Sequence, residues 1–350
     1  MTLHLDRTLC YKSILWEVKV KNETGIEVED TRHARLQASA DGLRRFQDSK
    51  FGMSVHWGLY SLSTHGREWI YFDDRIPYEI YRRRMEQFNP IRFNAEEWAD
   101  LMVEAGQKIL LITSKHHDGF CLWDTDHTDF KISNTVFKRD VLAELAPALR
   151  ERGIALHFYY SLIDWTHPSY RTDWPAYVAY YQAQLRELCT RFGPLGGILF
   201  DGYWPRMKFP DDWFEFMYPR GPWDLAGTYD LIHGLQPDAV IVNNTHLLPL
   251  KGEDYQIWEL DLPGENTIGF NGTEIGDNPT ACWWNVNQWS YQPWNHCVRS
   301  AEELLVTYRK LREKNSVFFL NVAPRPFGDI HPEEQRVLRG MGQTIRRLNL

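Results

Sequence analysis

The sequence has 350 residues, of which 43% are hydrophobic and 25% are charged, as in ordinary soluble globular proteins. Its formal net charge is −8 and it has no block of lysine and arginine, which excludes the electrostatic signature of a nucleic-acid-binding protein. No run approaches the roughly 18 apolar residues of a membrane span. Residues 1–40 show neither helical periodicity nor alternation, so we expect an N-terminal extension there. The start MTLHLDRTLC lacks the features of a signal peptide, and a cytoplasmic location is therefore expected.

From residue 41 onward, short apolar stretches alternate with segments of helical periodicity. Each stretch is continuously apolar, which is typical of strands buried on both faces of a parallel sheet. The stretches lie at residues 51–58, 108–119, 154–161, 196–203, 239–244, 254–261 and 316–324. Repeated alternation of this kind predicts an α/β protein.

The helical segments between these stretches begin with capping residues. Asn94 and Asp173 each precede a helical pattern, and Ser300 and Glu303 have the spacing of a capping box. No glycine-rich phosphate-binding motif follows any of the strands, which disfavours a doubly wound sheet. We therefore predict a TIM-like (β/α)8 barrel over residues 41–350, which is the catalytic domain of the chain.

Polar residues recur at the predicted carboxyl ends of the strands. Barrel enzymes build their active sites at that face, whereas packing does not require ionisable side chains there. The pattern therefore indicates a functional site. Its members are His56, His116, His117, Asp118, Asp201, Asn243, Asn244 and Glu259.

Asp201 follows the apolar run GGILF at the end of a buried strand. Its carboxylate is therefore costly to bury unless a hydrogen-bond donor or a cation contacts it. The spacing alone leaves two interpretations, a functional carboxylate or a cap of the next loop. Consecutive strand residues point to opposite faces, so His116 and His117 share one site only if a bulge or a loop carries them. Without a third ligand they are weak evidence for a metal, and we expect neither a metal nor a cofactor.

A set of motifs, taken in order, resembles glycoside hydrolase family 29, the α-L-fucosidases. The motifs are KFGMSVHWGLYSL, the EW pair at 68–69, ITSKHHDGFCLWDT, FYYSLIDW, ILFDGY and FFLNVAPRPFGDIHPEEQ. The resemblance covers residues 41–350 and implies that Asp201 is the nucleophile. It also implies that the fucose ring and its hydroxyl groups are held by His56, Glu68, Trp69, His116, His117 and Tyr160, with Trp289 near the methyl group of the sugar.

The chain departs from the family pattern at Leu199, Thr245 and Thr280, where members carry tryptophan, arginine and glutamate. These departures leave the acid/base as the open assignment. The family also carries a C-terminal β-sandwich, which we expect this chain to lack. The acceptor side of the site would then be built from barrel loops or from a second subunit.

Glu259 is our choice for the acid/base. It ends the apolar run that follows the strand of the predicted nucleophile, in the region where the family places this residue. Three other acids in the same region are alternatives, because strand ends are the least certain part of such a prediction. They are Glu265, Glu253 and Asp261.

The resemblance implies a retaining exo-α-L-fucosidase that cleaves fucosylated oligosaccharides or glycoconjugates through a covalent fucosyl–Asp201 intermediate. Two other functions fit the sequence. One is a glycosidase of galactoside type, since L-fucose and D-galactose share much hydroxyl stereochemistry. The other is a carbohydrate-binding protein of the same fold without catalysis. Neither nucleic acid nor a membrane is an expected partner, and a homo-oligomer is compatible with the sequence.

Overall fold

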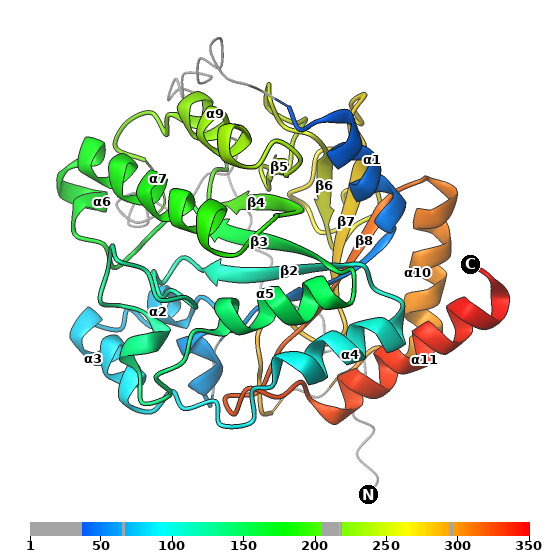
Figure 1. The fold of residues 1–350 in the computed structure, drawn as a ribbon, viewed down its shortest axis with the longest axis horizontal. Coiled ribbons are helices and arrows are strands. Elements are labelled where there is room, and N and C mark those ends of the chain that lie inside the picture. Colours follow the sequence, from blue (N-terminus) through cyan, green and yellow to red (C-terminus); the bar gives the residue numbers. More distant parts are fainter. Residues whose placement is uncertain (1–36, 65–66, 205–216, 218, 295–296) are drawn as a thin grey trace, which may run out of the picture.

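The computed structural model describes residues 37–64, 67–204, 217, 219–294 and 297–350. At its centre, eight parallel strands are arranged in the order β5-β4-β3-β2-β1-β8-β7-β6. They form a nearly closed barrel, which confirms the predicted (β/α)8 architecture (Figure 1). The strands are β1 (Phe51–Val55), β2 (Ile109–Lys115), β3 (Ala155–Ser161), β4 (Gly197–Asp201), β5 (Val240–Asn243), β6 (Gln256–Glu259), β7 (Thr280–Asn285) and β8 (Val317–Val322).

Helices surround the strands (Figure 1). The longer ones in the described ranges are α1 (Ala40–Ser49), α4 (Ala95–Ala105), α5 (Val141–Glu151), α7 (Trp174–Arg191), α9 (Leu225–Leu235), α10 (Ala301–Glu313) and α11 (Pro332–Leu348). The predicted caps are present. The side chains of Asn94 and Asp173 accept backbone N–H groups at the starts of α4 and α7, and Ser300 and Glu303 form a capping box at α10.

Side chains fill the interior of the barrel from its amino-terminal end. Phe46 of α1 enters there, with its ring centroid 4.4 Å from that of Tyr255 and 6.3 Å from that of Phe319. Above it, inward-facing residues such as Leu111 and Leu199 are almost fully buried. Because this end is packed, the opening at the carboxyl ends of the strands, called the mouth below, is left for a site.

β5 and β6 lie at the two ends of the strand order, and a side chain bridges them. The backbone N–H of Asp254 donates to the carbonyl oxygen of Ile241 at 2.8 Å. The carboxylate of Asp254 accepts the N–H of Ile241 at 2.7 Å. This pair of bonds brings the two edge strands together at their starts.

One strand, β7, is absent from the predicted set. Ala281, Cys282 and Trp283 are buried within it. The stretch between β6 and β7, residues 260–279, contains no helix, so strand–helix alternation gives no signal before β7. The seven apolar stretches of the sequence therefore correspond to seven of the eight strands.

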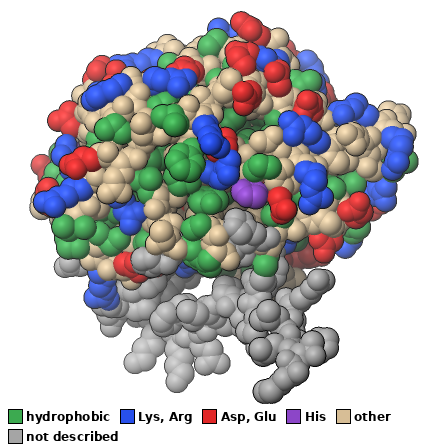
Figure 2. All heavy atoms as spheres, turned by 90° about the horizontal axis from the view of Figure 1, so that it is seen from below, with side chains coloured by type: hydrophobic (Ala, Val, Ile, Leu, Met, Phe, Trp, Pro, Cys, Tyr) green, Lys and Arg blue, Asp and Glu red, His purple; other side chains and the backbone are tan. Residues whose placement is uncertain are grey.

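Residues 1–36 lie outside the described part of the chain, so an N-terminal extension over residues 1–40 stays a prediction. Acidic and basic side chains are interspersed over the face of the molecule in Figure 2, without a field of one sign. Among the residues that the structure describes, no helix combines the length and the apolar character needed to cross a membrane.

Candidate active site

Asp201 is the last residue of β4, and its carboxylate lies at the mouth. The hydroxyl of Tyr159 donates to Oδ2 at 2.8 Å, and Nε1 of Trp204 donates to Oδ1 at 3.2 Å. Nε2 of His117 lies 3.6 Å from Oδ2. Burial raises the pKa of Asp201 to about 6, against the hydrogen bonds that favour the charged form. The carboxylate is therefore mostly ionised at neutral pH although its residue is only 8% exposed.

Glu259, the last residue of β6, faces Asp201 across a shared donor. Nδ2 of Asn244 donates to Oε2 of Glu259 at 3.0 Å and to Oδ1 of Asp201 at 3.4 Å. Asn244 therefore holds the two carboxyl groups side by side at the mouth, which is the arrangement that glycoside hydrolysis by a pair of carboxylates requires. Burial, and next the charge of Asp201, raise the pKa of Glu259 to about 8. At neutral pH Glu259 therefore holds a proton while Asp201 does not.

The three alternative acids lie in other surroundings. Glu253 is buried and accepts the hydroxyl of Tyr229 at 2.9 Å. Asp261 accepts backbone N–H groups of its own loop, at residues 267 and 268. Glu265 is exposed. Of the four candidate acids, Glu259 is the one that bonds to Asn244 in the described part of the chain. This contact favours Glu259 as the acid/base.

His116 and His117 both reach the mouth because β2 ends just before them. The register of β2 against β3 shifts between Thr113 and Lys115. His116 and His117 follow the last residue of β2, in the loop, where the strict alternation of a strand no longer applies. The ring of His116 stacks on that of Tyr159, with centroids 5.4 Å apart and an interplanar angle of 5°.

His56 and His117 are buried and uncharged. Burial lowers the pKa of His56 to about 4, and that of His117 well below its ordinary value. Nδ1 of His56 donates to Oδ1 of Asn321 at 2.8 Å. Nδ1 of His117 donates to Oγ of Ser161 at 2.6 Å, since the hydroxyl proton of Ser161 goes to the carbonyl of Ile163. Nε2 of each neutral ring is then an acceptor, which suits the hydroxyl donors of a sugar.

Glu68, Trp69 and Trp289 join this group. Glu68 is buried, which raises the pKa of its carboxyl group. The ring of Trp69 meets that of His117 edge-on at 5.4 Å, and the ring of Trp289 lies 5.3 Å from that of His56. Polar and aromatic side chains are therefore packed together at this site.

Tyr160 lies elsewhere, which corrects its expected placement at the site. Neighbouring residues of a strand point to opposite faces, and Tyr159 points into the barrel. The hydroxyl of Tyr160 therefore meets Gln184 on α7, to which it donates at 2.7 Å. Its ring covers Nζ of Lys115 at 4.5 Å. The tyrosine of β3 that lies beside Asp201 is Tyr159.

Three residues bond to the carboxylates although the sequence predicted no such contact for them. Strand alternation could have identified Tyr159. It lies on the same face of β3 as Ser161, and Ser161 pairs in register with Asp201. Asn244 stood among the polar residues at strand ends, but nothing in the sequence shows that it bridges two acids. Trp204 follows β4 in a loop, where no periodicity indicates its direction.

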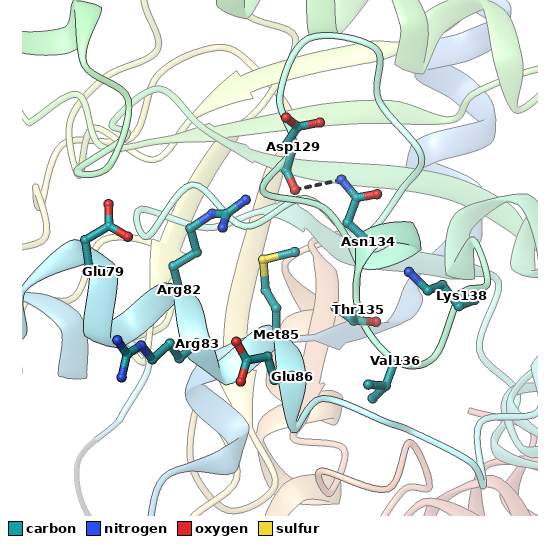
Figure 3. Close-up of a pocket in the computed structure, with 10 residues that line it drawn as sticks. All are labelled: Glu79, Arg82, Arg83, Met85, Glu86, Asp129, Asn134, Thr135, Val136 and Lys138. Carbon is teal, nitrogen blue, oxygen red and sulfur yellow. Dashed lines mark hydrogen bonds between the residues drawn. The ribbon is translucent and has the colours of Figure 1, made fainter.

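A separate cavity of about 480 Å³ lies between α3 (Tyr78–Arg82), η3 (Arg83–Glu86) and the loop 129–138 (Figure 3). Its lining combines both signs of charge with a few apolar groups and contains none of the predicted site residues. The lining residues are Glu79, Arg82, Arg83, Met85, Glu86, Asp129, Asn134, Thr135, Val136 and Lys138. No cluster of three or more histidine, cysteine or acidic side chains suited to a metal occurs within the described ranges.

A (β/α)8 barrel with two adjacent carboxylates of unequal pKa at its mouth has the architecture of a glycoside hydrolase. A family model described as "Alpha-L-fucosidase" matches residues 23–348. The chain belongs to this family.

Individual relatives agree with this membership. The chain is 31% identical over 281 residues to "Alpha-L-fucosidase 1" of Arabidopsis thaliana, covering 72% of this chain and 51% of that protein. It is 32% identical over 251 residues to "Plasma alpha-L-fucosidase" of Rattus norvegicus, covering 60% and 53%. The chain thus spans about half the length of the curated relatives it matches.

Solved structures show the same fold. Alpha-L-fucosidase isoenzyme 1 from Paenibacillus thiaminolyticus superposes with a TM-score of 0.76 at 30% identity, covering 87% of this chain and 75% of that chain. A GH29 α-L-fucosidase from Bacteroides thetaiotaomicron, described as a trapped covalent intermediate in complex with 2-fluoro-fucosyl fluoride, superposes with a TM-score of 0.74 at 25% identity, covering 90% and 78%.

Proposed function

We propose that this chain is a retaining exo-α-L-fucosidase that releases terminal α-L-fucose from fucosylated oligosaccharides or glycoconjugates. The observation that carries the proposal is the pair Asp201 and Glu259, joined by Asn244, with pKa values of about 6 and about 8. Membership of the α-L-fucosidase family supports the identity of the sugar. The covalent intermediate named for the Bacteroides thetaiotaomicron relative supports a double displacement.

In the first step, the ionised carboxylate of Asp201 attacks the anomeric carbon while the protonated Glu259 gives its proton to the leaving oxygen. In the second step, Glu259 takes a proton from water, which attacks the same carbon and releases Asp201. Two displacements at one carbon retain the α configuration. Tyr159, Trp204 and Asn244 hold the nucleophile in place through the hydrogen bonds that they donate.

Recognition of the sugar is assigned to the surrounding side chains. The acceptor nitrogens of His56 and His117 and the carboxyl group of Glu68 face hydroxyl groups, while the rings of Trp69 and Trp289 meet apolar parts of the sugar. A site that hydrogen-bonds hydroxyl groups rejects analogues lacking them far better than it rejects a missing methylene. The two carboxylates carry the chemistry without a cofactor.

The pH profile of kcat/KM should be bell-shaped, because Asp201 must be ionised and Glu259 must be protonated. Activity should fall below a pH of about 6 as Asp201 takes a proton, and above about 8 as Glu259 loses one. Tyr159→Phe removes a hydrogen bond that lowers the pKa of Asp201, so the acidic limb should move to higher pH. Tyr160→Phe, one residue away but facing α7, is the matched control and should leave that limb in place.

The anomeric form of the first product tests the stereochemistry. Proton NMR of 4-nitrophenyl α-L-fucoside during hydrolysis should show α-L-fucose before mutarotation, whereas early β-L-fucose contradicts a double displacement. Parallel assays with 4-nitrophenyl galactosides test the sugar. Faster hydrolysis of a galactoside, or binding of fucose without hydrolysis, would replace the proposed activity by one of the two alternatives.

A further inference from the structure

The leaving group must lie on the side of Glu259. A general acid donates to the glycosidic oxygen, and the leaving sugar is attached to that same oxygen. The residues packed around Glu259 at the mouth therefore border the acceptor side of the site. Among the described residues there are those of the segments that follow β5 and β6.

Asn271 connects Glu259 to these segments. Its Nδ2 donates to the carbonyl oxygen of Glu259 at 2.8 Å, and its Oδ1 accepts the backbone N–H of Glu259 at 3.4 Å. The carboxamide of Asn271 thus bonds along the edge of β6 as a neighbouring strand would. Nδ1 of His246 donates to the same Oδ1 at 3.1 Å, which ties in the segment after β5.

Phe270 is the exposed aromatic residue of this network. It directly precedes Asn271, and its side chain is 39% exposed. Its ring meets the ring of His246 edge-on, with centroids 4.6 Å apart and an interplanar angle of 69°. His246 is 6% exposed and stands two residues after Asn244, which bonds to both carboxylates. Phe270 is therefore held between two neighbours. Asn271 bonds to the backbone of Glu259, and His246 lies two residues after Asn244.

The imidazole ring of His246, against which Phe270 packs, is uncharged. Burial lowers the pKa of His246 to about 4, so its ring is neutral over the whole pH range in which the two carboxylates are in their working states. A neutral, buried ring under an exposed one leaves the outer aromatic face free for an apolar surface. Sugars and aryl groups both have such a surface.

We propose that Phe270, supported by His246, is the acceptor-side platform on which the leaving sugar or aryl group stacks. This assignment rests on the proposed fucosidase activity. It makes Phe270 a specificity-determining residue for the part of the substrate beyond the glycosidic oxygen. It assigns Phe270 no role toward the fucose ring itself.

Two substrates that differ only in the leaving group test the proposal. 4-Nitrophenyl α-L-fucoside has an aromatic leaving group, whereas α-L-fucosyl fluoride has a single atom. Phe270→Ala should lower kcat/KM for the aryl fucoside by about tenfold, as expected for the loss of one aromatic contact, and leave that for the fluoride unchanged. Phe270→Tyr should restore the aryl activity. The matched control is Phe327→Ala, because Phe327 is 52% exposed and lies over Arg92 instead.

Three results would overturn the platform alone: an equal loss on both substrates, no loss on either, or the same selective loss in Phe327→Ala. A wild-type protein that cleaves neither fucoside would instead overturn the proposed activity, and the platform with it. The fluoride assay on the wild type therefore separates the two failures.

Discussion

Replacing Asp201 by glycine is expected to reduce turnover of 4-nitrophenyl α-L-fucoside on the order of 10⁴-fold, because the attacking carboxylate is lost. Azide should restore part of the activity by entering the vacated space. Its attack displaces the leaving group once, so the product should be β-L-fucosyl azide. Initial rates with and without azide, together with NMR of the azide product, check this result.

The isosteric Asp201→Asn is the companion variant. It keeps the shape of the side chain and one acceptor oxygen for Trp204, yet it should be as slow as the glycine variant because it lacks the negative charge. Circular dichroism should show native folding for both variants. Activity near the wild-type level in either one would remove Asp201 from the role of nucleophile.

Glu259→Ala should affect substrates according to their leaving group. For a fucosyl disaccharide, whose leaving alcohol needs a proton, kcat/KM should fall by about 10²- to 10⁴-fold. For 2,4-dinitrophenyl α-L-fucoside, whose leaving group departs without one, kcat/KM should change little. The basic limb of the pH profile should also disappear, since it reports the proton of Glu259, whose pKa is about 8.

Glu265→Ala is the matched control, because Glu265 is an exposed glutamate of the loop after β6. It should leave both substrates and the basic limb unchanged. An equal loss on all leaving groups in Glu259→Ala would point to a binding or structural role. Glu253 and Asp261 would then be tested in the same way, since Glu265→Ala already tests Glu265.

The fold was largely predictable because its signals are local. Asn94 and Ser300 cap their helices through neighbours two or three residues away, so the chain itself carries that information. The strand β7 was missed because no helix separates it from β6, so strand–helix alternation gives no signal before it, although α10 follows it. A continuous apolar run is otherwise sufficient to indicate a strand buried between two layers.

The site was less predictable because its contacts join different strands. Alternation along β3 decides between Tyr159 and Tyr160, and the structure shows Tyr159 bonded to Asp201. Asn244 bridges two acids on β4 and β6, which no spacing along the chain reveals. The four candidate acids likewise differ in their three-dimensional surroundings rather than in their sequence context.

Covalent trapping tests the central claim most directly. A 2-deoxy-2-fluoro-α-L-fucosyl fluoride needs no acid to expel fluoride, and its fluorine at C2 slows the release of the sugar from the protein. Incubation followed by proteolysis and mass spectrometry should find the 2-fluorofucosyl group on the peptide that contains Asp201, attached to that carboxylate. A label on Glu259 or any other residue, or sustained release of fluoride with no label on the protein, would contradict the proposed mechanism.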